Sequence, residues 1–256
     1  MDKKNGTYEE LLENGRYFLK DSIRKTIDFS KTNQTQGFPA PPVEKPHNPK
    51  SLIIDMPMFD WGEKYDHSLV HAIQNRNSVR NFSKKPLSLE ELSFLLWSTQ
   101  GVKFVSGANV FRNVPSAGCR HALETYLTIF NVEDIQKGVY RYLPLTHQLV
   151  LEFEEENLKQ KMIKATFNQK FAGEGALTFI WSSIPSRMEW RYGVASHKVI
   201  ALDAGHVGQN LYLACEVINT GTCAIAAYDQ EYLDNLLRID GKEEFAIYIA
   251  PVGKLE

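Results

Sequence analysis

Two arginines and a serine at alternate positions are the first residues in this chain whose types and spacing could do chemistry. In the run Arg76-Asn77-Ser78-Val79-Arg80, an extended backbone would turn two guanidiniums and a hydroxyl to the same side. Proteins use these donors to bind phosphate and carboxylate groups. The spacing therefore predicts an anion-binding segment, with a solvated basic loop as the alternative because exposed arginines are common.

Two further segments have side chains small enough to let a flat ligand touch the backbone, and a third adds a cation. The first, Pro115-Ser116-Ala117-Gly118-Cys119-Arg120, combines a rigid proline with small residues. The second, Thr220 to Ala227, follows a long apolar helix and is otherwise a helix end leading into a core strand. The third, Ala250 to Lys254, leaves one cation beyond the last predicted strand, where it is otherwise a solubilising terminus.

The bulk composition excludes several classes of function. The 256 residues are 43% hydrophobic, enough for one large core, and the net charge of −2 comes from interspersed acids and bases. We therefore expect neither nucleic acid nor a membrane surface as a partner. Three cysteines without a C-x-x-C pair argue against disulfides and thiolate metal sites. The charged N-terminus and the lack of an apolar run of about 18 residues indicate a cytoplasmic protein.

Other common motifs are absent from the sequence. The nearest dinucleotide fingerprint, at 173–178, lacks its third glycine and precedes a strand instead of a helix. There is no phosphate loop, nucleophile elbow or H-E-x-x-H helix. His121 and Glu124 could share a metal ion, but no third ligand accompanies them, and a hydrogen-bonded or surface pair is commoner at this spacing. We expect no metal site.

The hydrophobic patterns predict an α+β chain without regular strand–helix alternation. Ser88 and Glu91 match a capping box at the start of a helix that Gly101 would end. The longest helical pattern runs from Ser196 to Ile218 and is apolar on most sides. The other expected elements are strands at 124–132, 138–143, 148–153, 176–183, 223–227 and 245–252, a helix at 155–168, and a helix capped by Asp229 that ends at Leu237.

The N-terminal part of the chain has a different composition. Residues 8–29 predict one amphipathic helix that needs a surface to pack on. Residues 30–50 contain five prolines and predict an extended arm rather than a packed element. We therefore divide the chain into an N-terminal helix and arm, residues 1–67, and a main domain, residues 68–256.

Taken together, the four small-residue and basic segments resemble the nitroreductase superfamily, and their sequences are most similar to the SagB-type dehydrogenases. The resemblance covers roughly Ser68 to Lys254 and rests on these runs: R-x-S-V-R-x-F-S, P-L-S-L-E-E-L-x-x-L-L-W-x-x-Q-G, P-S-A-G-x-R-H-x-L-E-x-Y, G-x-Y-R-Y, L-D-A-G-H-V-x-Q-N-L-Y-L-A, G-T-C-A-I and P-V-G-K. It implies an α+β fold with a central, mostly antiparallel sheet flanked by helices. It also implies a homodimer that binds FMN at the subunit interface.

The resemblance implies roles for particular residues. Arg76, Ser78 and Arg80, with Asn77 between them, would hold the FMN phosphate and ribityl chain, and Lys254 would join them. The loop Pro115, Ser116, Ala117, Gly118 and Arg120 would approach from the partner subunit. The flavin ring would pass the segment Gly221, Thr222, Ala224, Ile225, Ala226 and Ala227. If the dimer forms, the N-terminal helix and arm are expected to wrap the partner, so that deleting residues 1–50 weakens dimerisation and leaves the core folded.

Two departures from the family pattern bear on the reaction. The 116–120 loop lacks the asparagine of typical nitroreductases, and basic residues near the C-terminus are reduced to Lys254, which favours the SagB type. SagB-type azoline oxidases often have Lys-Tyr where this chain has Arg191-Tyr192, the candidate catalytic pair. Arginine stays protonated and cannot serve as the base. Packing and surface roles for both residues are the alternative.

The expected function is transfer of a hydride through FMN to or from a small or peptide-like substrate, with NADH or NADPH as a possible electron donor. Two other functions stay open. One is an FMN-binding module or a subunit that does not turn over by itself. The other is oxidation of thiazolines and oxazolines in peptides.

Overall fold

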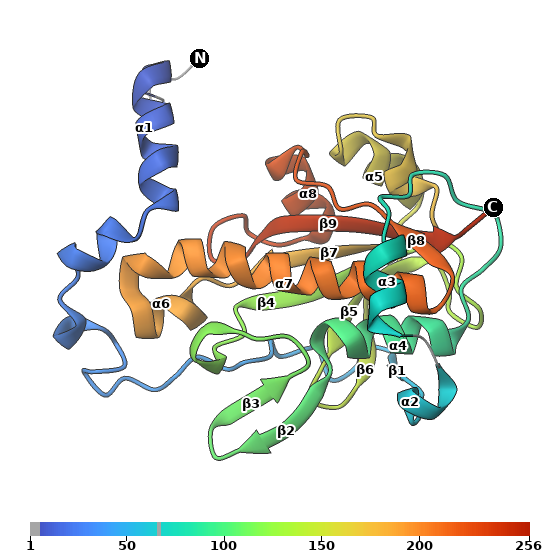
Figure 1. Ribbon diagram of the computed structural model, residues 1–256, viewed down its shortest axis with the longest axis horizontal. Coiled ribbons are helices and arrows are strands. Elements are labelled where there is room, and N and C mark those ends of the chain that lie inside the picture. The colour runs from blue at the N-terminus through green and yellow to red at the C-terminus, as the bar shows by residue number, and fades with distance from the viewer. Residues whose placement is uncertain (1–5, 66–67) are drawn as a thin grey trace.

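The computed structural model describes residues 6–65 and 68–256, which form an α+β fold around one seven-stranded sheet (Figure 1). The strand order is β1-β6-β5-β4-β7-β9-β8, and every neighbouring pair is antiparallel. The expected antiparallel sheet flanked by helices is confirmed. The strands are β1 (Ile53–Asp55), β4 (Leu123–Ile129), β5 (Gly138–Leu143), β6 (Gln148–Phe153), β7 (Leu177–Ser183), β8 (Thr220–Thr222) and β9 (Phe245–Lys254).

Helices cover both faces of this sheet and divide the core in two. On one face, α4 (Leu89–Gln100) and α7 (Ser196–Val217) pack with sheet residues into the larger apolar cluster. On the other face, α5 (Leu158–Ala165) and α8 (Gln230–Leu237) enclose the smaller one. Figure 1 shows α7 running along the sheet beside β4, β7 and β9.

Local sequence rules account for the helix ends that the sequence predicts. Ser88 accepts from the amide of Glu91, whose side chain accepts from the amide of Ser88, so the predicted capping box is present. Asp229 caps α8 by accepting from the amide of Tyr232. The predicted hairpin at 138–143 and 148–153 is also confirmed, with Tyr142 opposite Leu149.

The N-terminal helix is shorter than the sequence predicts. α1 spans Tyr8–Leu19, and Lys20 adopts an extended backbone that ends it. Two short 3₁₀ turns, Asp21–Thr26 and Phe29–Lys31, follow, so the expectation of one continuous helix over residues 8–29 is wrong. No residue of α1 is buried, and the helix stands away from the body of the molecule (Figure 1).

The proline arm is packed against the sheet, which corrects the expectation of an unpacked tether. The carbonyl oxygen of Val43 accepts from Arg112 at 2.9 Å. The carbonyl oxygens of Lys45 and Pro46 accept from Arg141 at 2.8 and 3.0 Å. Proline removes backbone donors but leaves the carbonyls free, so a proline-rich segment can be held in this way.

Glu124 lies at the centre of this region and links it to a third arginine. Its carboxylate accepts from Arg187 at 2.5 Å, from Arg141 at 3.3 Å and from the amide of Lys45 at 2.8 Å. We call Arg112, Arg141 and Arg187 the arginine belt. All three side chains are buried, and each donates to carboxylate, amide or carbonyl oxygens.

Several other elements differ from expectation. The strand predicted at 223–227 is wrong: the observed strand, β8, ends at Thr222. Within the predicted range, Ile225 makes only an isolated bridge to Ile249. The sequence patterns missed β1, α2 (Trp61–Lys64), α3 (Leu69–Asn75), α6 (Ser186–Tyr192), and the hairpin of β2 (Val102–Ser106) and β3 (Asn109–Arg112). The predicted division after residue 67 falls at residues 66–67, outside the described residues, and stays a prediction. None of the helices in the described ranges is long and apolar enough to cross a membrane.

Candidate functional site

The Arg76–Arg80 segment lies directly against the strand that carries Gly221 and Thr222. The amide of Val79 donates to the carbonyl oxygen of Thr222 at 2.9 Å, and Ser78 forms a parallel bridge with Thr222. A Cβ atom on Gly221 would lie 2.6 Å from the Cβ of Val79, closer than real side chains approach. Glycine at 221 therefore permits the contact that joins the Arg76–Arg80 segment to the Thr220–Ala227 segment.

Tyr212, on α7, links the two segments through its hydroxyl group. The hydroxyl lies 3.1 Å from the Oγ of Ser78 and accepts from the amide of Ala224 at 2.9 Å. The guanidinium of Arg76 lies 5.4 Å from the centre of its ring. We call Arg76, Ser78, Tyr212 and Ala224 the basic cluster. The sequence analysis missed Tyr212, although its L-Y-L-A run was part of the resemblance.

Arg76, Arg80 and Lys254 differ in whether a carboxylate pairs with them. Within residues 6–65 and 68–256, no carboxylate forms an ion pair with Arg76 or Arg80, and Arg80 lies over the ring of Phe171 at 5.7 Å. Lys254 is paired with Glu91, so its charge is already offset. Glu216 accepts from the backbone amide of Asn77 at 3.4 Å. Neither arginine therefore has a described carboxylate as a partner.

Only part of the Gly221–Ala227 segment is open to a ligand. The hydroxyl of Thr222 donates to Pro251 at 2.8 Å in the interior, and Ile225 exchanges both backbone hydrogen bonds with Ile249. Ala224 is half-buried, whereas Ala226 and Ala227 are exposed. A flat ligand would therefore meet the segment at its three alanines rather than at the buried side chains.

The Pro115–Arg120 loop lies beside the candidate catalytic pair, Arg191 and Tyr192. Gly118 has a φ of +59°, and a Cβ there would lie 2.7 Å from the hydroxyl of Tyr192 and 2.9 Å from Cδ of Arg191. Arg120 donates to the carbonyl oxygen of Gly118 at 3.2 Å and lies 5.0 Å from the ring of Trp190. We call Gly118, Arg120, Trp190, Arg191 and Tyr192 the α6 cluster.

Burial perturbs the charged groups around this loop. Burial, followed by the nearby charge of Arg191, lowers the pKa of Arg120. Asp203, on α7, accepts from the amide of Ala117 at 3.3 Å, and burial raises the pKa of its carboxyl group. Ser116 in turn accepts from the amide of His121 at 3.0 Å, and Pro115 is exposed. Asp203 is a second residue that the sequence analysis missed.

The single chain does not bring the two clusters together. Asp203 accepts from Ala117, the residue before Gly118 of the α6 cluster, whereas Tyr212 belongs to the basic cluster. The two residues stand nine positions apart on α7, a rise of about 14 Å. The sequence resemblance predicts this separation, since it assigns the loop at 116–120 to the partner's cofactor. That assignment stays a prediction.

The possible metal pair is engaged in other contacts. One ring nitrogen of His121 lies 2.6 Å from the carbonyl oxygen of Val110, and burial lowers the pKa of its imidazole to about 3. Glu124 accepts from the arginine belt. No group of three metal-ligating side chains occurs in the described part of the chain.

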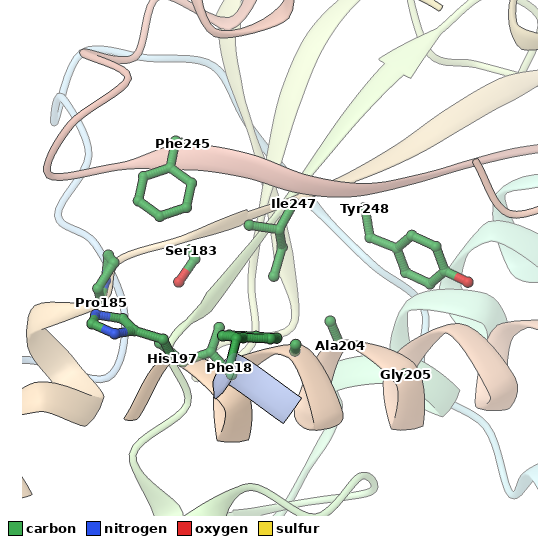
Figure 2. A pocket seen from close by; sticks show the side chains of 11 residues that line it. Phe18, Ser183, Pro185, His197, Ala204, Gly205, Phe245, Ile247 and Tyr248 are labelled. Carbon is green, nitrogen blue, oxygen red and sulfur yellow. The ribbon is translucent and has the colours of Figure 1, made fainter. Parts of the chain in front are cut away.

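An apolar trough between α7 and β9 begins near the basic cluster. Figure 2 shows Phe245, Ile247 and Tyr248 projecting from β9 toward α7, with Ser183 between the strand and the helix. The trough has a volume of about 450 Å³, and Phe18 of α1 also lines it. At one end of the trough, burial raises the pKa of the Tyr248 phenol, and the phenol of Tyr212 adds to this effect. We call this cavity the α7–β9 trough.

Comparisons with known proteins identify the family of the chain. The Nitroreductase family model matches residues 73–254. MJ1384 of Methanocaldococcus jannaschii, named as a candidate nitroreductase, is 31% identical over 186 residues, 73% of this chain and 90% of the relative. The trifolitoxin-processing protein TfxB of Rhizobium leguminosarum is 24% identical over 141 residues, 54% of this chain but only 38% of TfxB.

Solved structures share the fold at low sequence identity. A candidate nitroreductase from Anabaena variabilis has a TM-score of 0.69 at 22% identity, covering 83% of this chain, which spans 43% of that longer chain. A chain in the E. coli microcin synthetase McbBCD complex with truncated pro-MccB17 bound has a TM-score of 0.61 at 16% identity, covering all of both chains. At these identities the likeness shows the fold alone. The match over residues 73–254 and the M. jannaschii relative show that the chain belongs to the nitroreductase family.

Proposed function

We propose that the protein is an FMN-dependent oxidoreductase of the SagB type that works as a homodimer on a small or peptide-like substrate. The basic cluster carries this proposal. Arg76 lies with a serine hydroxyl around Tyr212, next to the open backbone at Ala224, and the contact of Val79 with Gly221 joins the two segments. Arg80, on the same segment, lies over Phe171, and neither arginine has a carboxylate partner among the described residues. This donor set fits a phosphate joined to a flat heterocycle.

The residues of the chain have distinct tasks in this proposal. Arg76, Arg80 and Ser78 bind the phosphate and ribityl chain, and the alanines at 224, 226 and 227 let the ring lie against the backbone. When bound, FMN supplies a two-electron centre that exchanges a hydride with the substrate. Tyr192 moves a proton through its phenol oxygen, while Arg191 orients a carboxylate or amide of the substrate, because its guanidinium stays protonated.

Two observations support the homodimer. The α6 cluster lies too far along α7 to reach the basic cluster of its own chain, so a second copy would complete the site. Exposed apolar side chains also lie together on the short helix α3: Leu69, Val70 and Ile73. Exposed apolar surface of this kind is typical of protein interfaces.

Azoline-peptide oxidation is the second candidate, and specific relatives favour it. The McbBCD complex holds a peptide, truncated pro-MccB17, and TfxB is named as a toxin-processing protein. Azoline oxidation needs a base for a carbon-bound proton. Arg191 stands where related enzymes often have lysine, so we expect this reaction to be weak or absent while hydride transfer remains.

The proposal is tested first on the purified protein. We expect a yellow dimer with about one FMN per chain, whose flavin is bleached by NADH or NADPH under anaerobic conditions. A colourless monomer that binds no added FMN would refute the proposal. A yellow dimer that no pyridine nucleotide reduces, and that no screened oxidant turns over, would favour a binding module.

The role of the catalytic pair is tested by two substitutions. Wild type, Tyr192→Phe and Arg191→Lys are compared for flavin reduction and for turnover of azoline peptides, quinones and nitroaromatics. We expect Tyr192→Phe to slow substrate turnover more than flavin binding. Rapid azoline oxidation by the wild type that Tyr192→Phe abolishes and Arg191→Lys leaves unchanged would show that arginine is no obstacle.

A further inference from the structure

Two glycines on α7 point to an occupant of the α7–β9 trough. At Gly208, a Cβ would lie 2.7 Å from the ring of Tyr248, so packing within the chain requires glycine there. At Gly205, which lines the trough, a Cβ would meet nothing within 4 Å. Glycine is among the least favourable residues inside a helix. The fold of the single chain therefore explains Gly208 but not Gly205.

Ser183 is a second, independent observation in the same trough. Its side chain is fully buried at the end of β7, and its Oγ has no hydrogen-bond partner among the described residues. Buried hydroxyl groups are normally satisfied by protein or by a bound molecule. Ser183 lines the trough, so a ligand there can supply the missing partner.

The rest of the lining defines the chemistry of that ligand. Phe18, Phe245 and Tyr248 contribute aromatic rings, and Ile200 and Ile247 contribute branched aliphatic side chains (Figure 2). A volume of about 450 Å³ lies in the range of small-molecule pockets. A flat apolar ring with one hydrogen-bonding substituent matches both the walls and Ser183.

The position of the trough relates it to the reaction. One end lies at Tyr248, whose ring packs against Gly208, one turn of α7 before Tyr212 of the basic cluster. The other end lies at His197, which is paired with Glu189 at 2.8 Å. The cavity is walled by α7, β9 and α1, and its only fully buried polar side chain is Ser183.

We infer that the α7–β9 trough binds an aromatic ring of the substrate, with Ser183 hydrogen-bonding to a polar substituent on that ring. The link to the substrate rests on the proposed function. The trough's affinity for such a ring does not, since none of its lining residues belongs to the basic cluster or the α6 cluster.

The test uses 2-naphthol and 2-methylnaphthalene, which have the same shape but only one of which carries a hydroxyl group. Their binding to the purified full-length protein is measured by fluorescence, and flavin content is recorded separately by absorbance. Gly205→Leu should weaken both probes at least tenfold, because the new side chain occupies the trough. Ser183→Ala should weaken 2-naphthol about fivefold and leave 2-methylnaphthalene unchanged.

Matched controls keep the outcomes separate. Gln209→Leu adds the same side chain to an exposed position of α7 outside the trough, and it should leave both probes unaffected. Unchanged 2-naphthol binding in Gly205→Leu would overturn the inference. So would a wild type that binds neither probe while Gly205→Leu changes the oligomeric state, since the occupant would then be a second copy. Probe binding without flavin would refute the proposed function but not the ring site.

Discussion

The basic cluster and the arginine belt use the same side chain in opposite ways. In the belt, Arg141 is 1% exposed and donates to Glu152 and Glu124 and to two carbonyl oxygens of the arm. In the basic cluster, Arg76 is half-buried and forms no ion pair with a described carboxylate; its contact is the ring of Tyr212. A buried guanidinium that donates to carboxylate and carbonyl oxygens stabilises the fold, whereas one without an acidic partner is available to a ligand.

This contrast also explains which arginines the sequence analysis chose. Arg76 and Arg80 stand in a regular short pattern that suggests a site. Arg112, Arg141 and Arg187 stand singly in apolar or mixed segments, and their partners lie far away in the chain. Substitutions and deletions can separate the structural arginines from the ligand-binding ones.

Deleting residues 1–50 should destabilise the core, because it removes the arm carbonyls that satisfy Arg112 and Arg141. Unpartnered buried charges typically cost about 3–5 kcal/mol each. The structure thus changes the expectation that this truncation leaves the core intact. Urea unfolding measures the loss. Deletion of residues 1–31 keeps the arm and should leave the midpoint unchanged, so it is the better test of whether α1 supports dimerisation.

Replacing Arg141 with Met should lower the free energy of unfolding by about 3 kcal/mol, because Glu124 and Glu152 lose a buried partner. FMN affinity of the folded protein should not change. Denaturant titration and flavin titration measure the two quantities. Arg24→Met, at an exposed ion pair with Asp21, should change stability by less than about 0.5 kcal/mol. A large loss of FMN affinity in Arg141→Met would blur the distinction between the two regions.

Replacing Arg76 with Ala should give the opposite pattern. Each charge-assisted contact with phosphate is worth about 1.5–3 kcal/mol, so FMN affinity should fall about tenfold or more. Unfolding of the FMN-free protein should be nearly unaffected, since no described carboxylate depends on this guanidinium. Flavin fluorescence titration measures the FMN affinity of the variant and of the wild type. Unchanged affinity would reduce the segment to a solvated basic loop.

Gly221→Ala should destabilise the junction between the basic segment and β8. The new Cβ would lie 2.6 Å from Val79, and overpacking of this kind costs about 1–3 kcal/mol. FMN affinity should fall as well, because the same contact positions Ser78. Gly205→Ala is the matched control: its Cβ meets nothing, so helix stability should rise by up to about 1 kcal/mol. Equal thermal midpoints for the two variants would contradict the close approach at Gly221.

The half-buried His147 should give the smallest effect, visible in the pH dependence of stability. The imidazole of His147 lies 2.8 Å from Ser93 and 2.6 Å from Tyr142, and burial lowers its pKa to about 4. Below about pH 6.5 the unfolded chain takes up a proton that the folded chain does not, so stability falls toward pH 4.

The variant His147→Gln isolates this contribution. Glutamine does not titrate, although it loses part of the hydrogen bonding and is less stable at pH 7. The stability gap between wild type and variant should therefore narrow between pH 7 and pH 4.5 in urea unfolding. A constant gap would show that His147 does not titrate in this range.

Local rules made several elements predictable from the sequence. The Ser88 capping box, the Asp229 cap and the hairpin at 138–153 depend on residues within a few positions of one another. The length of α7 followed from its continuous apolar pattern. The N-terminal helix was predicted too long, because helical spacing continues past Leu19 while the backbone at Lys20 is extended.

The sequence by itself determined the α+β class, the candidate segments and the family, because short motifs and periodic patterns carry that information. Only the tertiary structure decided which arginines have buried partners, since Arg141 donates to the carbonyl oxygen of Pro46 across 95 positions and Arg187 donates to Glu124 across 63. It also placed Tyr212 between Ser78 and Ala224 and left Gly205 facing open space. These features depend on how distant segments pack, and no local pattern encodes that packing.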